Sequence, residues 1–176
     1  MYAIDGFKLF SNDSPRSNSC TRPYRGMALY VKVPLSQNYF YCENSNGTEV
    51  IVFRVTPLKQ FTVIGLYRSP KVPMTQFWAA LRELLSQHSL TCNIVLGEFN
   101  VNWLNEIERR PLQNLLITGF HYRQLISSYT TDNRTAIDHI YTNITDCSVT
   151  SGTFETYFSD HKVIWISVER PNTTVN

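Results

Sequence analysis

Short runs in which apolar and polar residues alternate fill the first third of the chain. This two-residue period, typical of a strand with one buried face, occurs at residues 6–10, 27–33, 49–56 and 61–67. Residues 11–25 contain Asn-Asp-Ser-Pro and Arg-Pro and are typical of a loop. An Asn-Gly pair at positions 46 and 47 suits a hairpin turn. The pattern predicts strands joined by turns.

The apolar spacing lengthens to three or four residues after Pro73, which indicates an amphipathic helix over residues 74–87. A second helix is predicted over residues 111–118, with Pro111 in its first turn and Gly119 directly after its end. Further strands are predicted at residues 93–96, 122–126, 136–141, 153–157 and 162–168.

Many strands, two helices, and His and Asp residues at strand ends favour an α/β (α+β) fold. We expect two sheets to pack together and helices to cover the outside. Neither an internal repeat nor a linker is visible in the sequence. The expected organisation is one domain over residues 1–170 and a tail at residues 171–176.

The composition excludes several classes of protein. The chain has 176 residues, 43% hydrophobic and 13% aromatic, which is enough for one packed core. Its formal net charge of +2 permits a polyanionic partner but is far below that of a dedicated DNA-binding module. The cysteines at 20, 42, 92 and 147 form no Cys-x-x-Cys pair, so neither a zinc knuckle nor a redox dithiol is indicated. Cys92 adjoins an apolar run and is expected to be buried.

The sequence shows neither a secretory leader nor a membrane span, since no window approaches the roughly 18 apolar residues that a span needs. We expect an intracellular protein, nuclear or cytoplasmic rather than secreted, with no membrane partner. The oligomeric state is left open.

The first segment with chemical potential is Gly97-Glu98-Phe99-Asn100, which follows the apolar strand at residues 93–96. Alternate side chains of an extended stretch share a face, so Glu98 and Asn100 are expected to project together while Phe99 points into the core. A carboxylate can accept a proton from water, and a neighbouring amide can donate to a phosphate oxygen or fix the carboxylate.

The second segment is Ile137-Asp138-His139-Ile140, in which His139 faces one way and Asp138 the other. An Asp among apolar residues is costly unless it has a partner, and an imidazole is the expected one. A carboxylate that accepts from one ring N–H fixes the tautomer and makes the other nitrogen more basic.

The third segment, Ser159-Asp160-His161, precedes the predicted strand at residues 162–168. His161 can then contact a phosphate, and Asp160 can help to hold a metal ion or its water. Each segment also has a structural interpretation, with Glu98 as a turn residue and Asp138 as a solvated edge position. Residues 132–134 are better interpreted as a hairpin turn than as a site.

In order and spacing, these segments resemble the endonuclease/exonuclease/phosphatase superfamily, most of all the endonuclease domains of LINE-type retrotransposons and of some Helitron elements. The matching segments are Gly65-Leu66-Tyr67-Arg68-Ser69-Pro70, the helix after it, Ile94-Val95-Leu96-Gly97-Glu98-Phe99-Asn100, Ser128-Tyr129-Thr130-Thr131, Ile137-Asp138-His139-Ile140 and Ser159-Asp160-His161. The resemblance covers most of the chain. It implies a four-layer α-β-β-α sandwich of the deoxyribonuclease-I-like type.

The resemblance also implies a role for each matching residue. His161 would be the catalytic histidine near the scissile phosphate, with Asp138 as its orienting carboxylate. Glu98 would be the water-activating acid and Asp160 a metal-associated carboxylate. Two further positions, Asn100 and Tyr67, would contact the phosphate or the transition state. The implied cofactor is Mg²⁺ or Mn²⁺, and the implied partner is DNA.

Two departures from the family pattern affect these expectations. The water-activating acid of the family is usually Asp, so Glu98 is one methylene longer, a change that can cost on the order of a hundredfold in rate. Family members also carry a Glu, the principal Mg²⁺ ligand, on a strand before the region that matches residues 6–10. Glu43 and Glu49 come too late in the order to replace it. The chain is therefore expected to be the C-terminal two-thirds of such a domain.

Two hypotheses of different kinds follow. The first is a metal-dependent DNA endonuclease, derived from a transposable element, that nicks DNA. The second is an inactive relic or a DNA- or protein-binding module that keeps the fold. A third possibility keeps the phosphodiesterase chemistry but changes the substrate to a small phosphoester or phosphoinositide.

Overall fold

The computed structural model describes residues 3–13, 26–33, 35, 40–45, 48–55 and 61–169. Its largest sheet has six strands in the order β3-β4-β5-β6-β8-β7. In this sheet β5 and β6 pair in parallel and the other neighbours are antiparallel. The strands are β3 (Phe40–Ser45), β4 (Thr48–Val55), β5 (Phe61–Arg68), β6 (Cys92–Glu98), β7 (Arg123–Gln124) and β8 (Asp138–Thr142).

Helix α1 (Met74–Gln87) has the bounds that the sequence predicts. It connects the parallel strands β5 and β6, which a short hairpin turn cannot join. Pro73 precedes it, where a missing N–H does no harm to the helix. The apolar face of α1 is buried through Phe77, Leu81, Leu84 and Leu85.

The second helix begins earlier than predicted, as α2 (Glu106–Leu112), and continues as a π-helical segment, η2 (Gln113–Gly119). Its start is set by Asn105, whose side-chain oxygen accepts from the N–H groups of Ile107 and Glu108. Pro111 therefore lies inside the helix rather than in its first turn. The first turns are polar, so the apolar period that the prediction relied on begins only near Pro111.

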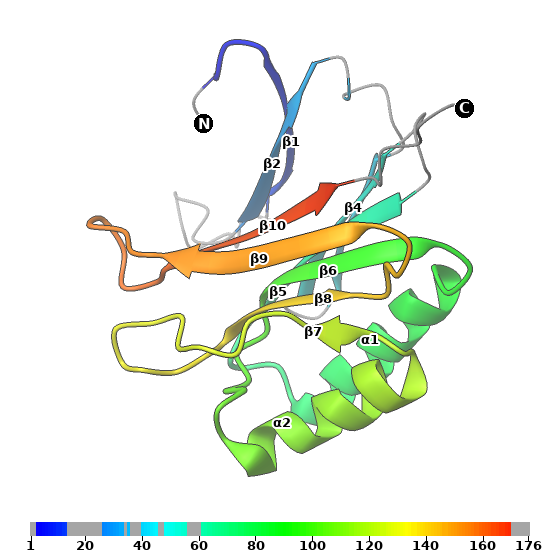
Figure 1. The fold of residues 1–176 in the computed structure, drawn as a ribbon, viewed down its shortest axis with the longest axis vertical. Helices are drawn as coiled ribbons and strands as arrows, with labels where there is room; N and C mark the ends of the chain where they lie inside the picture. The colour runs from blue at the N-terminus through cyan, green and yellow to red at the C-terminus, as the bar shows by residue number, and fades with distance from the viewer. Residues whose placement is uncertain are drawn as a thin grey trace, which may run out of the picture.

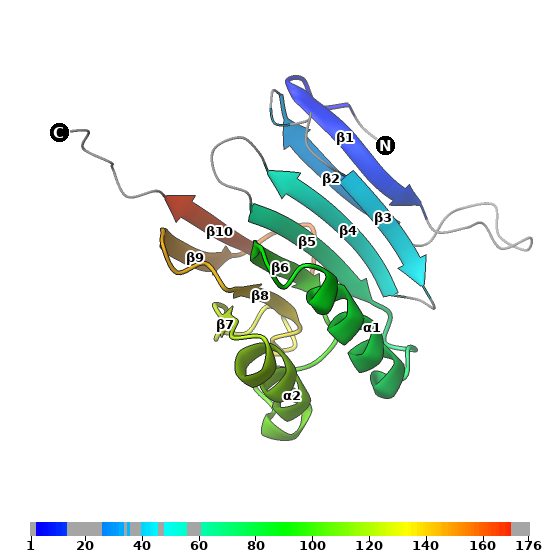
Figure 2. The same cartoon turned by 90° about the vertical axis from the view of Figure 1, so that its right-hand side faces the viewer.

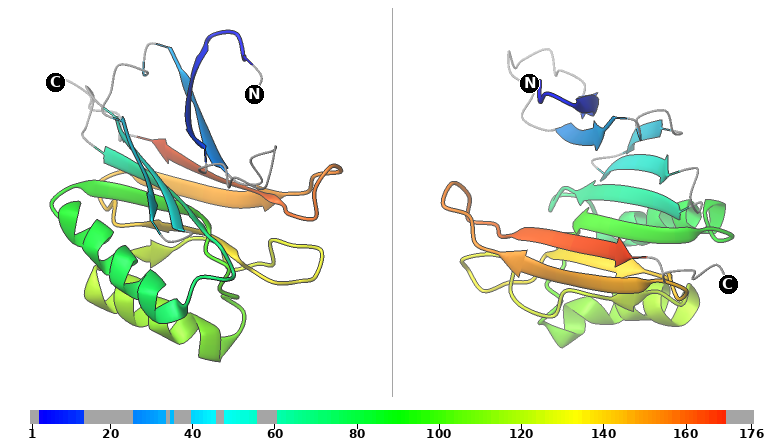
Figure 3. Two further views of the ribbon diagram at one scale, coloured as in Figure 1. Left: turned by 180° about the vertical axis from the view of Figure 1, so that it is seen from behind. Right: turned by 45° about the horizontal axis from the view of Figure 1, so that its top comes forward.

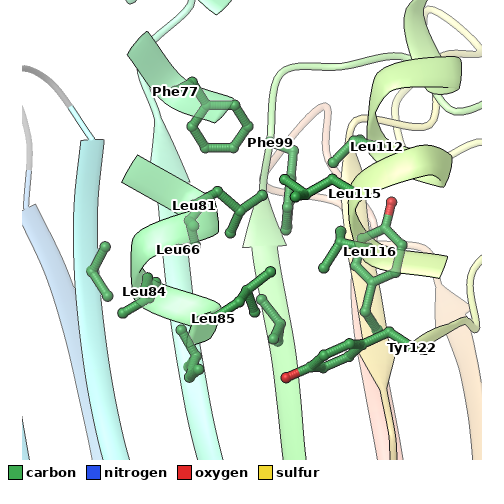
Figure 4. Packing of buried hydrophobic residues seen from close by; sticks show 14 of the residues in the cluster. Leu66, Phe77, Leu81, Leu84, Leu85, Phe99, Leu112, Leu115, Leu116 and Tyr122 are labelled. Atoms are coloured by element: carbon green, nitrogen blue, oxygen red, sulfur yellow. The ribbon is translucent and has the colours of Figure 1, made fainter. Parts of the chain in front are cut away.

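The main core lies between these helices and one face of the six-stranded sheet (Figure 4). The helices contribute Phe77, Leu81, Leu84, Leu85, Leu112, Leu115 and Leu116, and the sheet contributes Val50, Val52, Ile64, Leu66, Val95 and Tyr141. Both helices lie on the same side of the sheet (Figures 1 and 2). Burial of this many aliphatic and aromatic side chains is the main stabilising contribution to the fold.

The opposite face of the sheet is covered by strands. The antiparallel pair β9 (Ser148–Phe154) and β10 (Val163–Glu169) packs over it through a second, smaller apolar cluster that includes Ile94, Ile140 and Ile164. A further antiparallel pair, β1 (Phe7–Asp13) and β2 (Gly26–Lys32), lies farther along (Figure 3). An apolar pocket of about 220 Å³ lies between β2 and strands β4 to β6.

Several predictions need correction. In the described residues helices cover one outer face, not both as expected. Strand β9 begins and ends earlier than the predicted 153–157, and β3 was not predicted. Strand β7 is shorter than 122–126, and directly after it the Gln124 side chain accepts from the N–H of Ile126 (3.0 Å). Cys92 is only half-buried.

Some predictions fall on residues that the structure does not describe. These are most of the loop at 11–25, the turn at 46 and 47, Cys20, the side chain of Cys42 and the tail at 171–176. None of the helices in the described ranges has the length and apolar character needed to span a bilayer.

Candidate active site

Four polar residues form a row across the six-stranded sheet. Glu49 on β4 lies opposite Tyr67 on β5. Tyr67 is level with Glu98 on β6, which in turn lies opposite Asp138 on β8. Their neighbours Val50, Leu66 and Phe99 belong to the helix-covered core. Because side chains alternate along a strand, the polar row belongs to the face away from the helices.

Gly97 allows β5 and β6 to approach closely beside this row. It has a positive φ of 136°, which L side chains rarely adopt. A Cβ atom at this position would overlap the carbonyl oxygen of Leu66 on the neighbouring strand. The Gly before Glu98 is therefore a requirement of the backbone, whatever the chemistry of the site.

Asp138 and His161 form a hydrogen-bonded pair. The Nδ1 atom of His161 lies 2.9 Å from Oδ2 of Asp138. The hydroxyl of Thr130 donates to the same oxygen at 2.7 Å. This confirms the expectation that Asp138 has an imidazole partner, and with Nδ1 engaged, Nε2 is the ring nitrogen available to a substrate.

Two loops bring His161 to Asp138. Thr131 and His161 form an isolated antiparallel bridge. On either side of it, the N–H of Asp132 donates to the carbonyl of Asp160 (3.0 Å), and the N–H of Lys162 donates to that of Thr130 (2.8 Å). The turn is closed by the N–H of Arg134 donating to Thr131 (2.9 Å), as the hairpin interpretation of residues 132–134 predicts.

Glu98 and Asn100 form the other half of the site. The Asn100 amide donates to Oε1 of Glu98 and to the carbonyl of Arg68, both at 2.7 Å. Between them, Phe99 is fully buried, as the alternation predicts. Asn100 itself has a positive φ of 51°, a region that Asn tolerates better than most residues.

The backbone of this half is held by Arg68, a residue to which the sequence analysis gave no role. Its side chain is only 4% exposed. Its guanidinium donates to the carbonyls of Phe99 (2.6 Å), Asn100 (2.6 Å) and Val72 (2.9 Å). An Arg directly after an apolar strand was the only indication in the sequence, and spacing alone does not show which carbonyls it meets.

His139 connects the two halves from the core side. Its Nε2 lies 2.9 Å from the carbonyl of Val101 and 3.0 Å from that of Ala136, so the N–H is on this nitrogen. Its Nδ1 then accepts from the hydroxyl of Tyr141 (2.9 Å). The ring also stacks on Phe99, with centroids 4.9 Å apart. Burial lowers the pKa of His139 to about 4, so the ring is neutral.

The charges in the site shift two pKa values. Burial raises the pKa of the Glu98 carboxyl, although the hydrogen bond from Asn100 and the nearby His161 act against this. Partial burial alone would lower the pKa of His161, but the charge and hydrogen bond of Asp138, with Glu98 and Asp160 nearby, raise it. An acid that holds its proton more tightly and an imidazolium that is stabilised are typical of acid–base sites.

Comparisons with known proteins identify the fold. No family model and no curated protein matches the sequence. Among solved structures, the endonuclease domain of TRAS1, a telomere-specific non-LTR retrotransposon, is similar with a TM-score of 0.67 at 13% identity, over 95% of this chain and 80% of that one. An endonuclease/exonuclease/phosphatase family protein from Leptotrichia buccalis is similar with a TM-score of 0.69 at 14% identity, over 94% and 72%. The chain has the endonuclease/exonuclease/phosphatase fold.

A third structure of this fold, a family protein from Bacteroides thetaiotaomicron, is similar with a TM-score of 0.56 at 12% identity, over 94% of this chain and 76% of that one. The sequence-based resemblance to this superfamily is thus confirmed at the level of the fold. At such low identities the likeness concerns the path of the chain, and the chemistry has to be argued from the site itself.

Among the described residues, one group could hold a metal ion. It consists of Glu98, Asp138 and His161, whose potential ligand atoms all lie within 4.8 Å of one another. Carboxylate oxygens suit Mg²⁺ or Mn²⁺, which also keep several water ligands. The hydrogen bonds described above use Oδ2 of Asp138 and Oε1 of Glu98, leaving the second oxygen of each carboxylate for an ion or its water. The donor set fits such a cation.

The remaining candidate residues lie around this cluster. Asp160 is close enough to influence the pKa values of Glu98 and His161, but it is not in the cluster of potential ligands. Tyr67 lies beside Glu98 in the sheet. Glu49, set aside on its order in the sequence, is buried in the same row. Only the pairing of β4 with β5 reveals its position.

Proposed function

We propose that this chain is a divalent-metal-dependent phosphodiesterase whose substrate is DNA, of the kind found in transposable-element endonucleases. The observation that carries the proposal is the cluster of Glu98, Asp138 and His161, assembled from three separate segments at one end of the sheet. The likeness of the fold to a retrotransposon endonuclease domain supports the choice of DNA.

The residues divide the chemistry between them. Glu98 accepts a proton from the water that attacks phosphorus, and the amide of Asn100 keeps its carboxylate in place. The bond from phosphorus to the leaving sugar oxygen breaks, and that oxygen takes a proton from solvent water. His161, held through Nδ1 by Asp138, donates from Nε2 to the phosphate, which gains charge in the transition state. Tyr67, level with Glu98, contacts the phosphate from the neighbouring strand. Asp160, whose charge reaches Glu98 and His161, would help to hold a divalent cation.

A divalent cation held by the carboxylates of Glu98 and Asp138 would stabilise the charge of the phosphoryl oxygens. Since Glu98 must be ionised to act, its raised pKa predicts that activity falls as the pH is lowered toward that pKa. His161 must be protonated to donate, so its raised pKa extends the active range to higher pH.

The second candidate is a catalytically inactive module that binds DNA or protein. The observation that favours it is Glu98 itself, which is one methylene longer than the family's Asp and is partly withdrawn by its hydrogen bond to Asn100. In that case the cluster would bind a cation and DNA but would not hydrolyse the phosphodiester bond.

A nicking assay separates the two candidates. Supercoiled plasmid is incubated with the chain and Mg²⁺ or Mn²⁺, with EDTA as the metal-free control. We expect relaxed circles to form only with metal, and His161→Ala to reduce the rate by about a thousandfold, within the usual range for loss of an acid–base group.

The matched control is His121→Asn. His121 is exposed and lies two residues before β7, which pairs with the end of β8 that is distant from Asp138. Its positive φ of 58° suits Asn. Metal-dependent nicking that His161→Ala leaves unchanged, or no nicking above the background of that variant, would refute the catalytic proposal.

A further inference from the structure

Two aromatic side chains are displayed on the loop between β9 and β10. Tyr157 is 99% exposed and Phe158 is 75% exposed. Their rings contact each other edge to face, with centroids 5.4 Å apart. A single exposed apolar residue is ordinary on a protein surface, but aromatic residues are enriched in binding surfaces relative to the rest of the surface.

Hydrogen bonds across its base hold this loop in shape. The hydroxyl of Thr156 donates to the carbonyl of His161 (2.8 Å) and lies 3.3 Å from that of Ser159. The N–H of His161 donates to the hydroxyl of Ser159 (3.0 Å). The loop therefore closes on itself just before His161, and the two rings are held out toward solvent on a closed turn.

The pair is close to the candidate active site along the chain. Phe158 comes three residues before His161, and three residues span at most about 10 Å. The bridge between Thr131 and His161 brings the neighbouring loop to the same end of the molecule (Figures 1 and 3). That loop adds Tyr129, and the ammonium of Lys162 lies 3.6 Å from the centroid of its ring.

We propose that Tyr157 and Phe158 form a stacking platform for an unstacked nucleobase of the substrate strand, within about three nucleotides of the phosphate that His161 contacts. This inference rests on the proposed function, since it takes the substrate to be DNA. Every base has a π-face, so stacking on aromatic rings contributes affinity without reading sequence. The charge of Lys162 is balanced by its ion pair with Glu155 (2.8 Å), so the rings rather than a free cation carry the affinity.

The platform predicts a preference for unpaired DNA. In a duplex both faces of each base are covered by its neighbours, so a base must leave the stack before it can pack on Tyr157 or Phe158. Single strands, or duplexes with a bulge or mismatch beside the cleaved bond, offer such a base at lower cost. The chain should therefore bind single strands more tightly than duplexes of the same length.

Binding can be measured without cleavage. A 5′-labelled 16-nucleotide single strand is titrated with the chain in EDTA and followed by fluorescence anisotropy. We expect Tyr157→Ala/Phe158→Ala to weaken binding at least about fivefold, the lower end of the range for loss of base stacking. Tyr157→Trp/Phe158→Trp should preserve binding, and Tyr157→Leu/Phe158→Leu should not, because only the first keeps the rings.

The matched control is Leu90→Ala. Leu90 is 100% exposed and precedes β6 at the end of that strand opposite to Glu98, so its removal should leave binding unchanged. A second control is an abasic strand of the same length, on which the alanine double variant and the wild type should bind alike.

Each outcome decides one of the two claims. Equal binding of the normal strand by wild type and alanine double variant would overturn the platform and leave the nuclease proposal intact. Loss of binding in the double variant, together with absence of metal-dependent nicking by the wild type, would support the platform and refute catalysis. Equal loss in the Leu90→Ala variant, or binding rescued by Leu as well as by Trp, would also overturn the platform.

Discussion

The two halves of the candidate site are held in different ways. A bridge between two loops brings His161 to Asp138, the first residue of β8, and both of these side chains are half-buried. Glu98 and Asn100 follow directly from a strand, and the buried guanidinium of Arg68 fixes the carbonyls beside them. The position of His161 therefore depends on loop pairing. The position of Glu98 and Asn100 depends on the Arg68 guanidinium that binds the backbone beside them.

The two halves therefore differ in how far they can adjust when a substrate binds. In the Asp138–His161 half, Asp138 is the first residue of β8, but His161 sits on a loop, which can adjust when a substrate arrives. The Glu98–Asn100 half sits on a strand end that cannot adjust without breaking several buried hydrogen bonds. We therefore expect substitutions in the first half to affect chemistry with little loss of stability, and substitutions under the second half to affect stability as well.

The largest expected effect is on the Asp138–His161 half. Asp138→Asn should reduce the nicking rate by about a thousandfold, because an amide neither fixes the His161 tautomer nor stabilises its imidazolium. The pKa of His161 should fall, since Asp138 is the chief group that raises it. A titration of the His161 ring by NMR in wild type and variant measures this. A rate loss with an unchanged His161 pKa would contradict the assignment of Asp138 as its partner.

In the Glu98–Asn100 half, Glu98→Asp tests whether the extra methylene of Glu98 slows the reaction. If the longer side chain misplaces the carboxylate by about an ångström, the shorter one should raise the rate, by up to about a hundredfold. Glu98→Gln, which keeps the length but not the charge, should lower it. Measured kcat values for the three forms give the comparison, and a fall in kcat for Glu98→Asp would show that Glu is the residue that this backbone requires.

Arg68 supports the backbone of the Glu98–Asn100 half, and Arg68→Met should lower the free energy of unfolding by about 3 kcal/mol or more. It removes donors from the buried carbonyls of Phe99 and Val72 and from the partly buried carbonyl of Asn100, and each unsatisfied buried group costs about 1 kcal/mol or more. Urea unfolding at pH 7 measures the loss. Asp138→Asn serves as the contrast, with a loss of less than about half of this. Equal losses in the two variants would remove the distinction between the halves.

Substitution of His139, which connects the halves, should have a smaller effect on stability, and one that depends on pH. Its pKa of about 4 in the folded state lies below the ordinary value of 6.5. Between these values the unfolded chain binds a proton that the folded chain does not, so the free energy of unfolding falls as the pH is lowered from 6.5 to 4. Over this pH range the free energy of unfolding should fall by about 2 kcal/mol more for wild type than for His139→Gln. Parallel pH profiles of the two proteins would contradict this.

Local patterns were enough to predict much of the fold. Helix α1 was predicted at its observed bounds because Pro73 marks its start and its apolar stripe is continuous. The burial of Phe99 and the shared direction of Glu98 and Asn100 followed from strand alternation alone. Strand β3 and the first turns of α2 were missed because no apolar period marks them.

The arrangement of the site depends more on the pairing of segments that are distant along the chain, and the spacing of residues in the sequence does not reveal this pairing. The position of Glu49 beside Tyr67 comes from the register of β4 on β5, and the place of His161 comes from its bridge to Thr131. The contacts of Arg68 join residues more than 30 positions apart along the chain. Motif resemblance could supply the pairing of Asp138 with His161, but it did not indicate Arg68 or His139.

The central claim is that the two halves act as one site on one phosphodiester bond. A double-mutant cycle on metal-dependent plasmid nicking, with Glu98→Gln, His161→Ala and the combined variant, tests it most directly. Groups that act as a unit give non-additive losses. We predict that the combined variant loses no more than about threefold beyond His161→Ala alone. Losses that multiply across the two variants would contradict the claim and show that the halves work independently.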